Sequence, residues 1–268
     1  MIKAALVIQE SLAGKYDLNL ACCLNFISKA AAANAKIIVF PEMNLTGYVA
    51  GPEIKEICRP ITKEITALFC DLAKTHDMDI WVGLAEQTED KKIYATHLVF
   101  HPDAPPTRYR KIHTAPNEKK YFTAGDKIIT FTSFGFNFGV QLCYDAHFPE
   151  LSLAMALKNA DIIFIPHASP RGTSQEKYDS WMRHLTARAF DNGVYIAACN
   201  QTGDNKMGLH FPGLCLLIGP DGNIIYTSKD DSSEGLHMIQ LEKSVLNHVR
   251  NHKMRYFIPN RRNDLFRF

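Results

Sequence analysis

This sequence lacks a large excess of charge of either sign, and it lacks a long apolar run. Its 30 Lys and Arg residues nearly balance 28 Asp and Glu residues, and the formal net charge of +2 is too small to indicate a nucleic-acid or membrane-surface partner. No run of about 18 apolar residues occurs, so a transmembrane helix is not expected. The first apolar run ends at Gln9, too soon for the core of a signal peptide. We therefore expect a cytoplasmic protein that has neither a membrane nor a nucleic acid as its partner.

The seven cysteines lack the spacing of a disulfide or metal framework. Their number is odd and none forms a CxxC pair. Five of the seven lie in apolar segments, where a free cysteine behaves as a small hydrophobic residue. We expect reduced thiols, as is usual in a cytoplasm. The histidines follow neither HExxH nor another zinc-ligand spacing, so no metal is expected.

What the sequence does contain is a regular alternation of strand and helix patterns. Apolar residues make up 46% of the 268 residues, enough for a sizeable core. Apolar spacing predicts helices over 16–33, 60–76, 149–159 and 174–191. Strands are predicted over 3–9, 36–40, 79–86, 93–100, 136–142, 161–166, 194–199, 214–218, 223–227 and 236–241. This order repeats in the two halves without a linker, and therefore predicts a layered α/β fold made of one domain, residues 1–268.

Two segments of the first half deliver charged residues. Glu42 follows strand 36–40 directly and precedes a glycine-containing loop. The carboxylate therefore lies at the carboxyl edge of the sheet, where ligands bind in open α/β sheets, although a loop or capping glutamate would give the same pattern. Lys111 lies in segment 108–113, where cations alternate as they do on a solvated edge strand. Neither residue alone indicates a catalytic site.

Cys143 is the third candidate, because it ends predicted strand 136–142 and precedes predicted helix 149–159. A thiol near a helix N-terminus has its thiolate favoured by the exposed N–H groups and the helix dipole. The same N–H groups can hold a developing oxyanion. A strand–turn–helix of this kind presents the nucleophilic serine of other hydrolases. A buried structural cysteine is the alternative at this position.

Together these segments resemble the nitrilase superfamily of carbon–nitrogen hydrolases. The motifs follow the order and spacing of that family over nearly the whole chain. They are Phe-Pro-Glu-x-x-x-Thr-Gly-Tyr at 40–48, Arg-Lys-Ile-His at 110–113, Glu118, Phe-x-x-Gly-Asp at 122–126, Gly-Val-Gln-Leu-Cys-Tyr-Asp at 139–145, Pro-His-Ala-Ser-Pro at 166–170, Ala-Cys-Asn-Gln at 198–201, Gly-Pro-Asp-Gly at 219–222 and Arg-Arg-x-Asp-Leu at 261–265.

The resemblance implies a four-layer α-β-β-α sandwich of two similar α/β halves, and a cysteine-dependent hydrolase without metal or organic cofactor. It assigns Cys143 as the nucleophile and Glu42 as the base. Lys111 would donate to the negative oxygen of the tetrahedral intermediate, and Glu118 would orient Lys111 or the substrate nitrogen. The backbone N–H of Tyr144 is the expected second donor to that oxygen. A thioester acyl-enzyme would form, ammonia or amine would leave, and water would release the acid.

The substrates of the family are nitriles, amides and N-carbamoyl compounds. The residues expected to contact the substrate are Tyr48, Tyr144, His147 and His167, although the aromatic ones could equally serve packing. Several family members that bind carboxylate-bearing substrates have arginine where His147 stands, and no arginine follows here until Arg171. We therefore expect an uncharged or amine-bearing amide or carbamoyl compound, unless Arg171 reaches the site. A nitrile ranks lower, because a dedicated nitrilase has tryptophan where Tyr144 stands.

Two other classes of protein are compatible with these residues. A non-catalytic interaction protein of the same fold is one, which the presence of all four catalytic residues disfavours. A cysteine peptidase that pairs Cys143 with His113, His147 or His167 is the other, and it lacks a glutamine-containing oxyanion signature here. The family also implies a homodimer or a larger homo-oligomer. Helix 174–191 and the C-terminal tail, about 245–268, are the expected interface.

Overall fold

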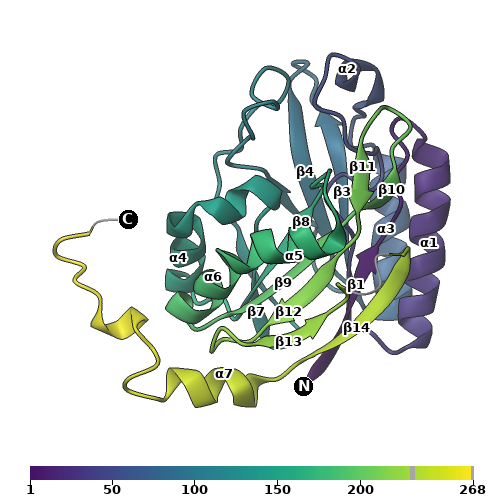
Figure 1. Cartoon of the computed structure of the whole chain (residues 1–268). Coiled ribbons are helices and arrows are strands. Elements are labelled where there is room, and N and C mark those ends of the chain that lie inside the picture. Colours follow the sequence, from purple (N-terminus) through teal and green to yellow (C-terminus); the bar gives the residue numbers. More distant parts are fainter. Residues whose placement is uncertain (230–232, 267–268) are drawn as a thin grey trace.

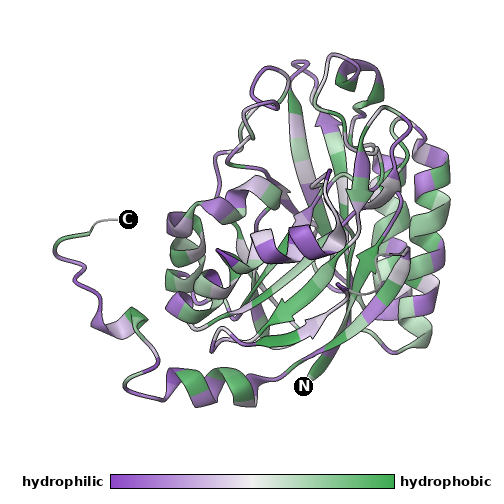
Figure 2. Ribbon diagram, viewed as in Figure 1, coloured by the Kyte–Doolittle hydropathy of each residue, from purple (hydrophilic) through white to green (hydrophobic). Residues whose placement is uncertain are grey.

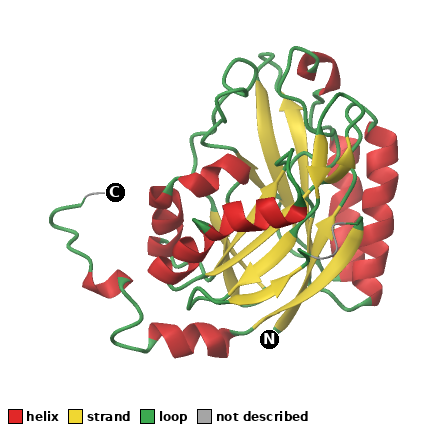
Figure 3. Cartoon of the chain, in the orientation of Figure 1, coloured by secondary structure: helices red, strands yellow, loops and turns green. Residues whose placement is uncertain are grey.

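The computed structural model describes residues 1–229 and 233–266. In these residues the chain forms two six-stranded sheets and a separate two-stranded hairpin. Figure 1 shows the sheets stacked on one another, and Figure 3 shows the helices on their outer sides. None of the helices in this part of the chain is long and apolar enough to cross a membrane.

The first sheet is built from the first half of the chain and one returning strand. Its order is β14-β1-β2-β3-β4-β5, with β1, β2 and β3 parallel to one another. The strands are β1 (Ile2–Ile8), β2 (Ile37–Val39), β3 (Asp79–Gln87), β4 (Ile93–Phe100), β5 (Thr107–Arg110) and β14 (Gly235–Leu241). Helices α1 (Tyr16–Ala32) and α3 (Lys63–His76) connect the parallel strands, and the short α2 (Ile54–Ile57) lies in the loop after β2.

The second sheet repeats this plan with the order β13-β12-β9-β8-β7-β6, in which β7, β8 and β9 are parallel. Its strands are β6 (Thr130–Ser133), β7 (Phe136–Val140), β8 (Ile162–His167), β9 (Tyr195–Asn200), β12 (Cys215–Ile218) and β13 (Ile224–Thr227). The helices of this half are the 3-10 helix η1 (Cys143–His147), α4 (Pro149–Leu157), α5 (Ser174–Met182) and α6 (Leu185–Asn192). The hairpin pairs β10 (Thr202–Asp204) with β11 (His210–Pro212).

A single apolar layer lies between the two sheets. Trp81 of β3 contacts Phe164 of β8 with ring centroids 4.9 Å apart, and Phe138 of β7 with centroids 6.0 Å apart, both edge-on. Figure 2 shows the apolar strands of this interior. The outer face of the first sheet is covered by α1 and α3, and that of the second by α4, α5 and α6. The predicted four-layer α-β-β-α sandwich of two similar halves is therefore confirmed.

The helix predicted over 174–191 is wrong in one respect, because it is two helices. Between α5 and α6, the backbone of His184 has φ −132° and ψ −38°, which is not helical. Trp181 before the break and Leu185 after it are both buried against the second sheet. Apolar spacing continues through the break, which is why the sequence did not reveal it.

Several short elements were not predicted, including β6, β10, β11 and the C-terminal helix α7 (Lys243–Arg250). The predicted helix 60–76 begins three residues later than expected. Thr62 caps it, because its side-chain oxygen accepts a hydrogen bond of 3.3 Å from the backbone N–H of Ile65.

The C-terminal tail is tied to the second half through Asp161, which precedes β8. Arg250 of α7 donates to Asp161 Oδ1 at 2.7 Å and to the carbonyl of Ala160 at 2.7 Å, and Lys243 pairs with the same carboxylate. Beyond α7 and the 3-10 helix η2 (Ile258–Asn260), the chain runs away from the body (Figure 1) and is mostly exposed. Residues 267–268 of the expected interface lie outside the described residues.

Candidate active site

Glu42 is positioned by a tight loop that follows β2 and lies flat on β3. Met43 has φ +55°, and its backbone nitrogen would lie 2.6 Å from a Cβ at Gly83, so only glycine in β3 allows this approach. Asn44 fastens the loop, because its side-chain oxygen accepts a hydrogen bond of 2.8 Å from the backbone N–H of Gly83. Gln201, after β9, donates to the Glu42 carbonyl at 2.7 Å. Both sheets therefore hold Glu42 in place.

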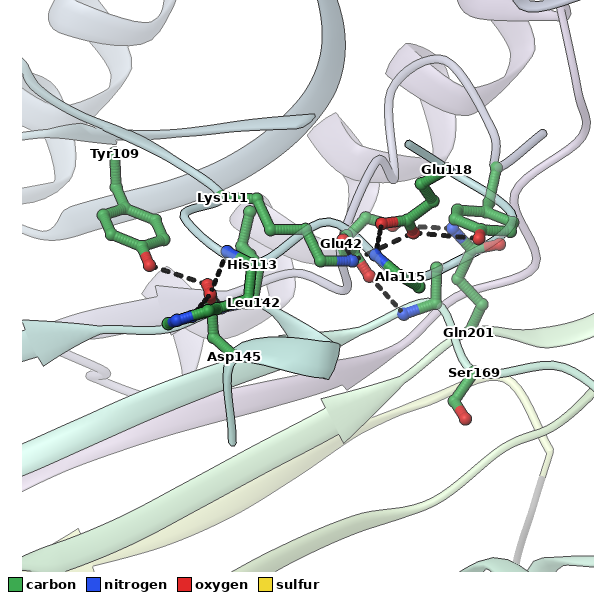
Figure 4. Close-up of polar contacts among 12 residues, drawn as sticks. Glu42, Tyr109, Lys111, His113, Ala115, Glu118, Leu142, Asp145, Ser169 and Gln201 are labelled. Carbon is green, nitrogen blue, oxygen red and sulfur yellow. Dashed lines mark hydrogen bonds and ion pairs between the residues drawn. The ribbon is translucent and has the colours of Figure 1, made fainter. Parts of the chain in front are cut away.

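Lys111 lies between two carboxylates. It follows β5 directly, and only 1% of its side chain is exposed. Its Nζ lies 2.9 Å from Glu42 Oε1 and 2.9 Å from Glu118 Oε1. Glu118 is held in turn by the hydroxyl of Tyr48, at 2.9 Å, and by the backbone N–H of Ala115, at 2.7 Å. Figure 4 shows the Lys111 ammonium between the two acids.

Cys143 lies in a strained turn rather than at the end of a strand. The sequence predicted a strand over 136–142 and a helix over 149–159. In the structure β7 ends at Val140 and Cys143 begins the five-residue helix η1, while α4 begins at Pro149 as predicted. Its φ is +43°, which is uncommon for a residue with a side chain. The side chain is partly exposed.

Asp145 holds this turn, and sequence reasoning gave it no role. Its carboxylate accepts hydrogen bonds from Leu142 N at 3.0 Å, His113 N at 2.8 Å and the Tyr109 hydroxyl at 2.7 Å. Each of these donors lies close to Cys143 or Lys111 along the chain, and Figure 4 shows them around the carboxylate. The aspartate therefore fixes the turn of Cys143 to the segment that carries Lys111. The signal in the sequence for this role was the position of Asp145 two residues after Cys143.

The end of β8 completes the site. The backbone N–H of Ala168 donates to Glu42 Oε2 at 3.0 Å, and its proximity to the Cys143 thiol acts against the rise in that thiol's pKa. The following residue, Ser169, is clamped by Asn200, whose side chain accepts from Ser169 N at 2.8 Å and donates to Ser169 O at 3.0 Å. Ala168 thus holds the Glu42 carboxylate against a clamped loop.

Burial sets the protonation of these groups. It raises the pKa of Glu42 to about 7, with Lys111 acting against the rise and Glu118 adding to it. Burial and the nearby Glu42 raise the pKa of the Cys143 thiol to about 12, against the opposing charge of Lys111. Burial disfavours the charged form of Lys111, but Glu42 and Glu118 outweigh that effect and raise its pKa. Near neutral pH the thiol is protonated, Lys111 is charged, and Glu42 is close to its titration point.

The four residues expected to contact substrate occupy different surroundings. Tyr48 is buried and donates to Glu118. Tyr144 and His147 lie beside each other on η1, with ring centroids 5.4 Å apart, and both are at least partly exposed. His167 is buried against Trp181, with centroids 4.1 Å apart, and burial holds its pKa well below the ordinary value.

A cysteine–histidine pair is absent from the described part of the chain. No hydrogen bond joins Cys143 to His113, His147 or His167 among residues 1–229 and 233–266. His113 Nδ1 is 2.9 Å from Asp145, and its ring stacks on Phe148 with centroids 3.8 Å apart. These contacts engage His113 away from the thiol. Nor do three or more His, Cys, Asp or Glu side chains gather there as a metal-binding group.

Comparison with known proteins gives the family. Residues 3–251 match the family model for carbon–nitrogen hydrolases. A nitrilase from Pyrococcus abyssi is 30% identical over 238 residues, which cover 87% of this chain and 87% of the nitrilase. An (R)-stereoselective amidase from Pseudomonas sp. is 26% identical over 238 residues, which cover 88% of this chain and 84% of the amidase.

The fold is also that of a structurally characterised amidase. The amidase of Nesterenkonia sp. AN1 superposes with a TM-score of 0.84 at 20% identity, and the match covers 99% of this chain and 98% of the amidase. In structures of that enzyme, acrylamide has added to the active-site cysteine, and a variant without the cysteine holds butyramide. From the match over 3–251 and these likenesses, the chain belongs to the carbon–nitrogen hydrolase family and is a hydrolase of non-peptide carbon–nitrogen bonds.

Proposed function

We propose that the protein is a small-molecule amidase in which Cys143 is the nucleophile, Glu42 the general base and acid, and Lys111 the oxyanion donor. The observation that carries this proposal is the buried Glu42–Lys111–Glu118 cluster, with Nζ–Oε distances of 2.9 Å to each acid. The Cys143 thiol lies near enough for the charges of all three residues to act on its pKa. A nucleophile, a base and a cation within reach of one another are what acyl transfer through a thiol requires.

Acylation begins with attack of Cys143 Sγ on the amide carbon. The thiol proton passes to ionised Glu42, since a thiol with a pKa of about 12 reacts only with a base at hand. The carbonyl oxygen becomes negative and accepts hydrogen bonds from the third proton of Lys111 Nζ and from the Tyr144 backbone N–H. Glu42 then gives its proton to the nitrogen, the carbon–nitrogen bond breaks, and ammonia or amine leaves a thioester on Cys143.

Deacylation reverses the proton path. Glu42 is ionised again after the amine departs, and it takes a proton from a water molecule that attacks the thioester carbon. The second tetrahedral intermediate places its negative oxygen against the same two donors. It collapses to the free acid when the carbon–sulfur bond breaks, and Glu42 returns the proton to the Cys143 sulfur. A pKa of about 7 suits a group that gains and loses a proton twice per cycle.

Glu118 acts through Lys111 in this scheme. It shares the ammonium with Glu42 and is itself fixed by Tyr48 and Ala115. Two carboxylates keep Lys111 charged despite its burial and leave one of its three protons for the substrate. Tyr48 therefore supports the catalytic cation rather than the substrate.

Small amides are the first substrates to test, and N-carbamoyl compounds the second. The amidase names of the Pseudomonas and Nesterenkonia proteins, and the butyramide bound to the latter, support this order. Ammonia release should be measured over short amides, N-carbamoyl amines, N-carbamoyl acids and nitriles. Wild type should hydrolyse amides, whereas Cys143→Ala should hydrolyse none of the panel. Cys70→Ala, which removes a half-buried thiol on α3, is the matched control and should keep full activity.

Two results would contradict the proposal. Equal activity of wild type and Cys143→Ala would mean that Cys143 is not the nucleophile. If folded wild type releases ammonia from no compound of the panel, a non-catalytic role would be favoured.

We also propose that the chain is one domain that works as a cytoplasmic homo-oligomer. The shared layer between the sheets supports one domain, and seven free cysteines support a reducing compartment. Exposed apolar residues of the tail, among them Met254, Leu265 and Phe266, support an interface at about 245–268, with α5 and α6 as the second surface. Light scattering at micromolar concentration should give at least a dimer, and a monomeric mass would contradict this part.

A further inference from the structure

Lys177 of α5 is a half-buried cation without a carboxylate partner in the described residues. Its Nζ donates to Ser169 Oγ at 2.8 Å and to the Pro170 carbonyl at 3.2 Å, and no ion pair involves it in residues 1–229 and 233–266. Burial lowers its pKa. Lysine is rarely withdrawn from water without a charged partner. Two of the three ammonium protons are engaged, which leaves one free.

The place of Lys177 in the fold is beside the thiol. Its hydrogen-bond partner Ser169 follows Ala168, whose backbone N–H donates to Glu42. The Cys143 thiol and Glu176 both act against the lowering of the Lys177 pKa, so the ammonium lies within electrostatic range of the thiol.

The neighbouring titratable side chains do not supply a counter-charge. His147, His167 and His184 all have lowered pKa values, chiefly through burial, and are neutral near pH 7. Lys111 is already balanced by its two carboxylates. An anion that arrives with the substrate would therefore find Lys177 as its partner.

We infer that Lys177 binds a carboxylate at the far end of the substrate, so that the preferred substrates are half-amides of dicarboxylic acids. This inference rests on the proposed amidase function and names the substrate class within it. The third ammonium proton donates to a carboxylate oxygen, while Ser169 and Pro170 hold the other two. Substrates whose far end carries an amine are repelled by the same charge.

This substrate class differs from the one expected from the residues just after Cys143. His147 stands there instead of arginine, and Arg171 is exposed in a left-handed turn. The cation that serves the site comes instead from α5, later in the chain, and reaches the thiol side because the loop after β8 is clamped by Asn200.

The experiment compares kcat/KM for the monoamides of succinic, glutaric and adipic acid with neutral amides of the same chain lengths and with 4-aminobutanamide. We expect wild type to prefer one half-amide by about tenfold or more, since a charge pair at a site shielded from water is strongly discriminating. Lys177→Met should lower kcat/KM for that half-amide by about 100-fold and for the neutral amide by less than about threefold. Lys177→Arg should restore most of the preference. Lys158→Met, at an exposed lysine after α4, is the control.

Each contrary outcome has one meaning. An equal loss on charged and neutral amides would show that Lys177 only supports the loop at 169–170, and would overturn the inference. A preference for neutral or amine-bearing amides would overturn it as well, while leaving the amidase function intact. If no amide is hydrolysed, calorimetry of the half-amide with Cys143→Ala and with Cys143→Ala/Lys177→Met still decides it, because equal binding to both contradicts the inference. Lys177→Gln replaces Lys177→Met if the latter does not fold.

Discussion

Glu118 and Lys111 form a buried ion pair of 2.9 Å although only seven residues separate them in the chain. The turn between them brings the Glu118 carboxylate to the same ammonium that Glu42 binds. The cluster carries two acids and one cation, so it has a net negative charge when both acids are ionised. That excess is one reason why Glu42 can hold a proton near neutral pH.

Replacing Glu118 by glutamine should shift the pH profile as well as reduce the rate. Glu118 raises the pKa of Glu42, so its neutralisation lowers that pKa and moves the rising limb of the kcat/KM profile to lower pH. Lys111 also loses one of its two acids, and we expect kcat to fall by about 10- to 100-fold. The profile of Glu118→Gln, measured against the exposed control Glu89→Gln, tests this. A lower rate with an unshifted limb would mean that Glu118 supports only the structure.

The wild-type profile itself reports on Glu42. The base must be ionised to accept the thiol proton, so activity is low when Glu42 is protonated and rises as pH increases through about 7. Below that pH, kcat/KM should fall about tenfold per unit. Glu42→Gln should lose the limb and about 10²- to 10⁴-fold of the rate. A rising limb at the ordinary glutamate value of 4.5 would contradict the role of burial at this residue.

Asp145 should be required for the turn that presents Cys143. Its carboxylate receives donors from Leu142, His113 and Tyr109, and an asparagine amide in its place would turn an NH2 group toward some of them. Leaving buried donors unpaired costs about 1–3 kcal/mol each. Asp145→Asn should therefore lower the free energy of unfolding by about that amount and reduce kcat/KM, whereas Tyr109→Phe, which removes one donor, should have a smaller effect. Chemical denaturation and kinetics measure both, with Asp103→Asn as the exposed control. Wild-type kinetics in a folded Asp145→Asn protein would show that the turn holds without the carboxylate.

His97 should make the protein less stable in acid. Burial lowers its pKa from 6.5 to about 3, so between these values the unfolded chain binds a proton that the folded chain refuses. Above pH 6.5 the histidine is neutral in both states and does not change the free energy of unfolding. As pH falls from 6.5 toward 3, protonation of the unfolded chain lowers that free energy by about 1.4 kcal/mol per pH unit. His97→Leu removes this dependence. Urea unfolding at several pH values should show that the free energy of unfolding falls less for the variant than for wild type as pH falls from 6.5. An equal fall in both proteins would contradict the prediction. His248→Leu, on the exposed face of α7, is the control.

Much of the architecture follows from local patterns in the sequence. β2 is a short β-branched strand that runs into Pro41 and Glu42, and its continuous apolar character reflects burial on both faces. The turn Gly-Pro-Asp-Gly at 219–222 predicted the hairpin of β12 and β13. The apolar pattern of a single strand or helix and the residues of a tight turn depend only on neighbouring residues. Strands, helices and turns of this kind could therefore be predicted from the sequence.

What the sequence could not supply depends on contacts between distant segments. The positive φ of Cys143 is held by Asp145, which is itself fixed by Tyr109 from the other half of the chain. The break before α6 leaves the apolar spacing of Trp181 and Leu185 unchanged, so that spacing does not register it. Lys177 could not be connected with the thiol because it depends on the clamped loop after β8. The proposed catalytic residues were identified by family resemblance, and the structure adds the distances of 2.9 Å from Lys111 to Glu42 and to Glu118.

The central claim is that Cys143 carries the acyl group during turnover, and intact-protein mass spectrometry tests it most directly. Wild type and Cys143→Ala should be quenched in acid during turnover of butyramide, and the labelled peptide of wild type should then be mapped. We predict a mass increase of one butyryl group in wild type, located on Cys143, and no increase in Cys143→Ala. Ammonia release without a label on Cys143, or a butyryl group on another residue, would contradict the account.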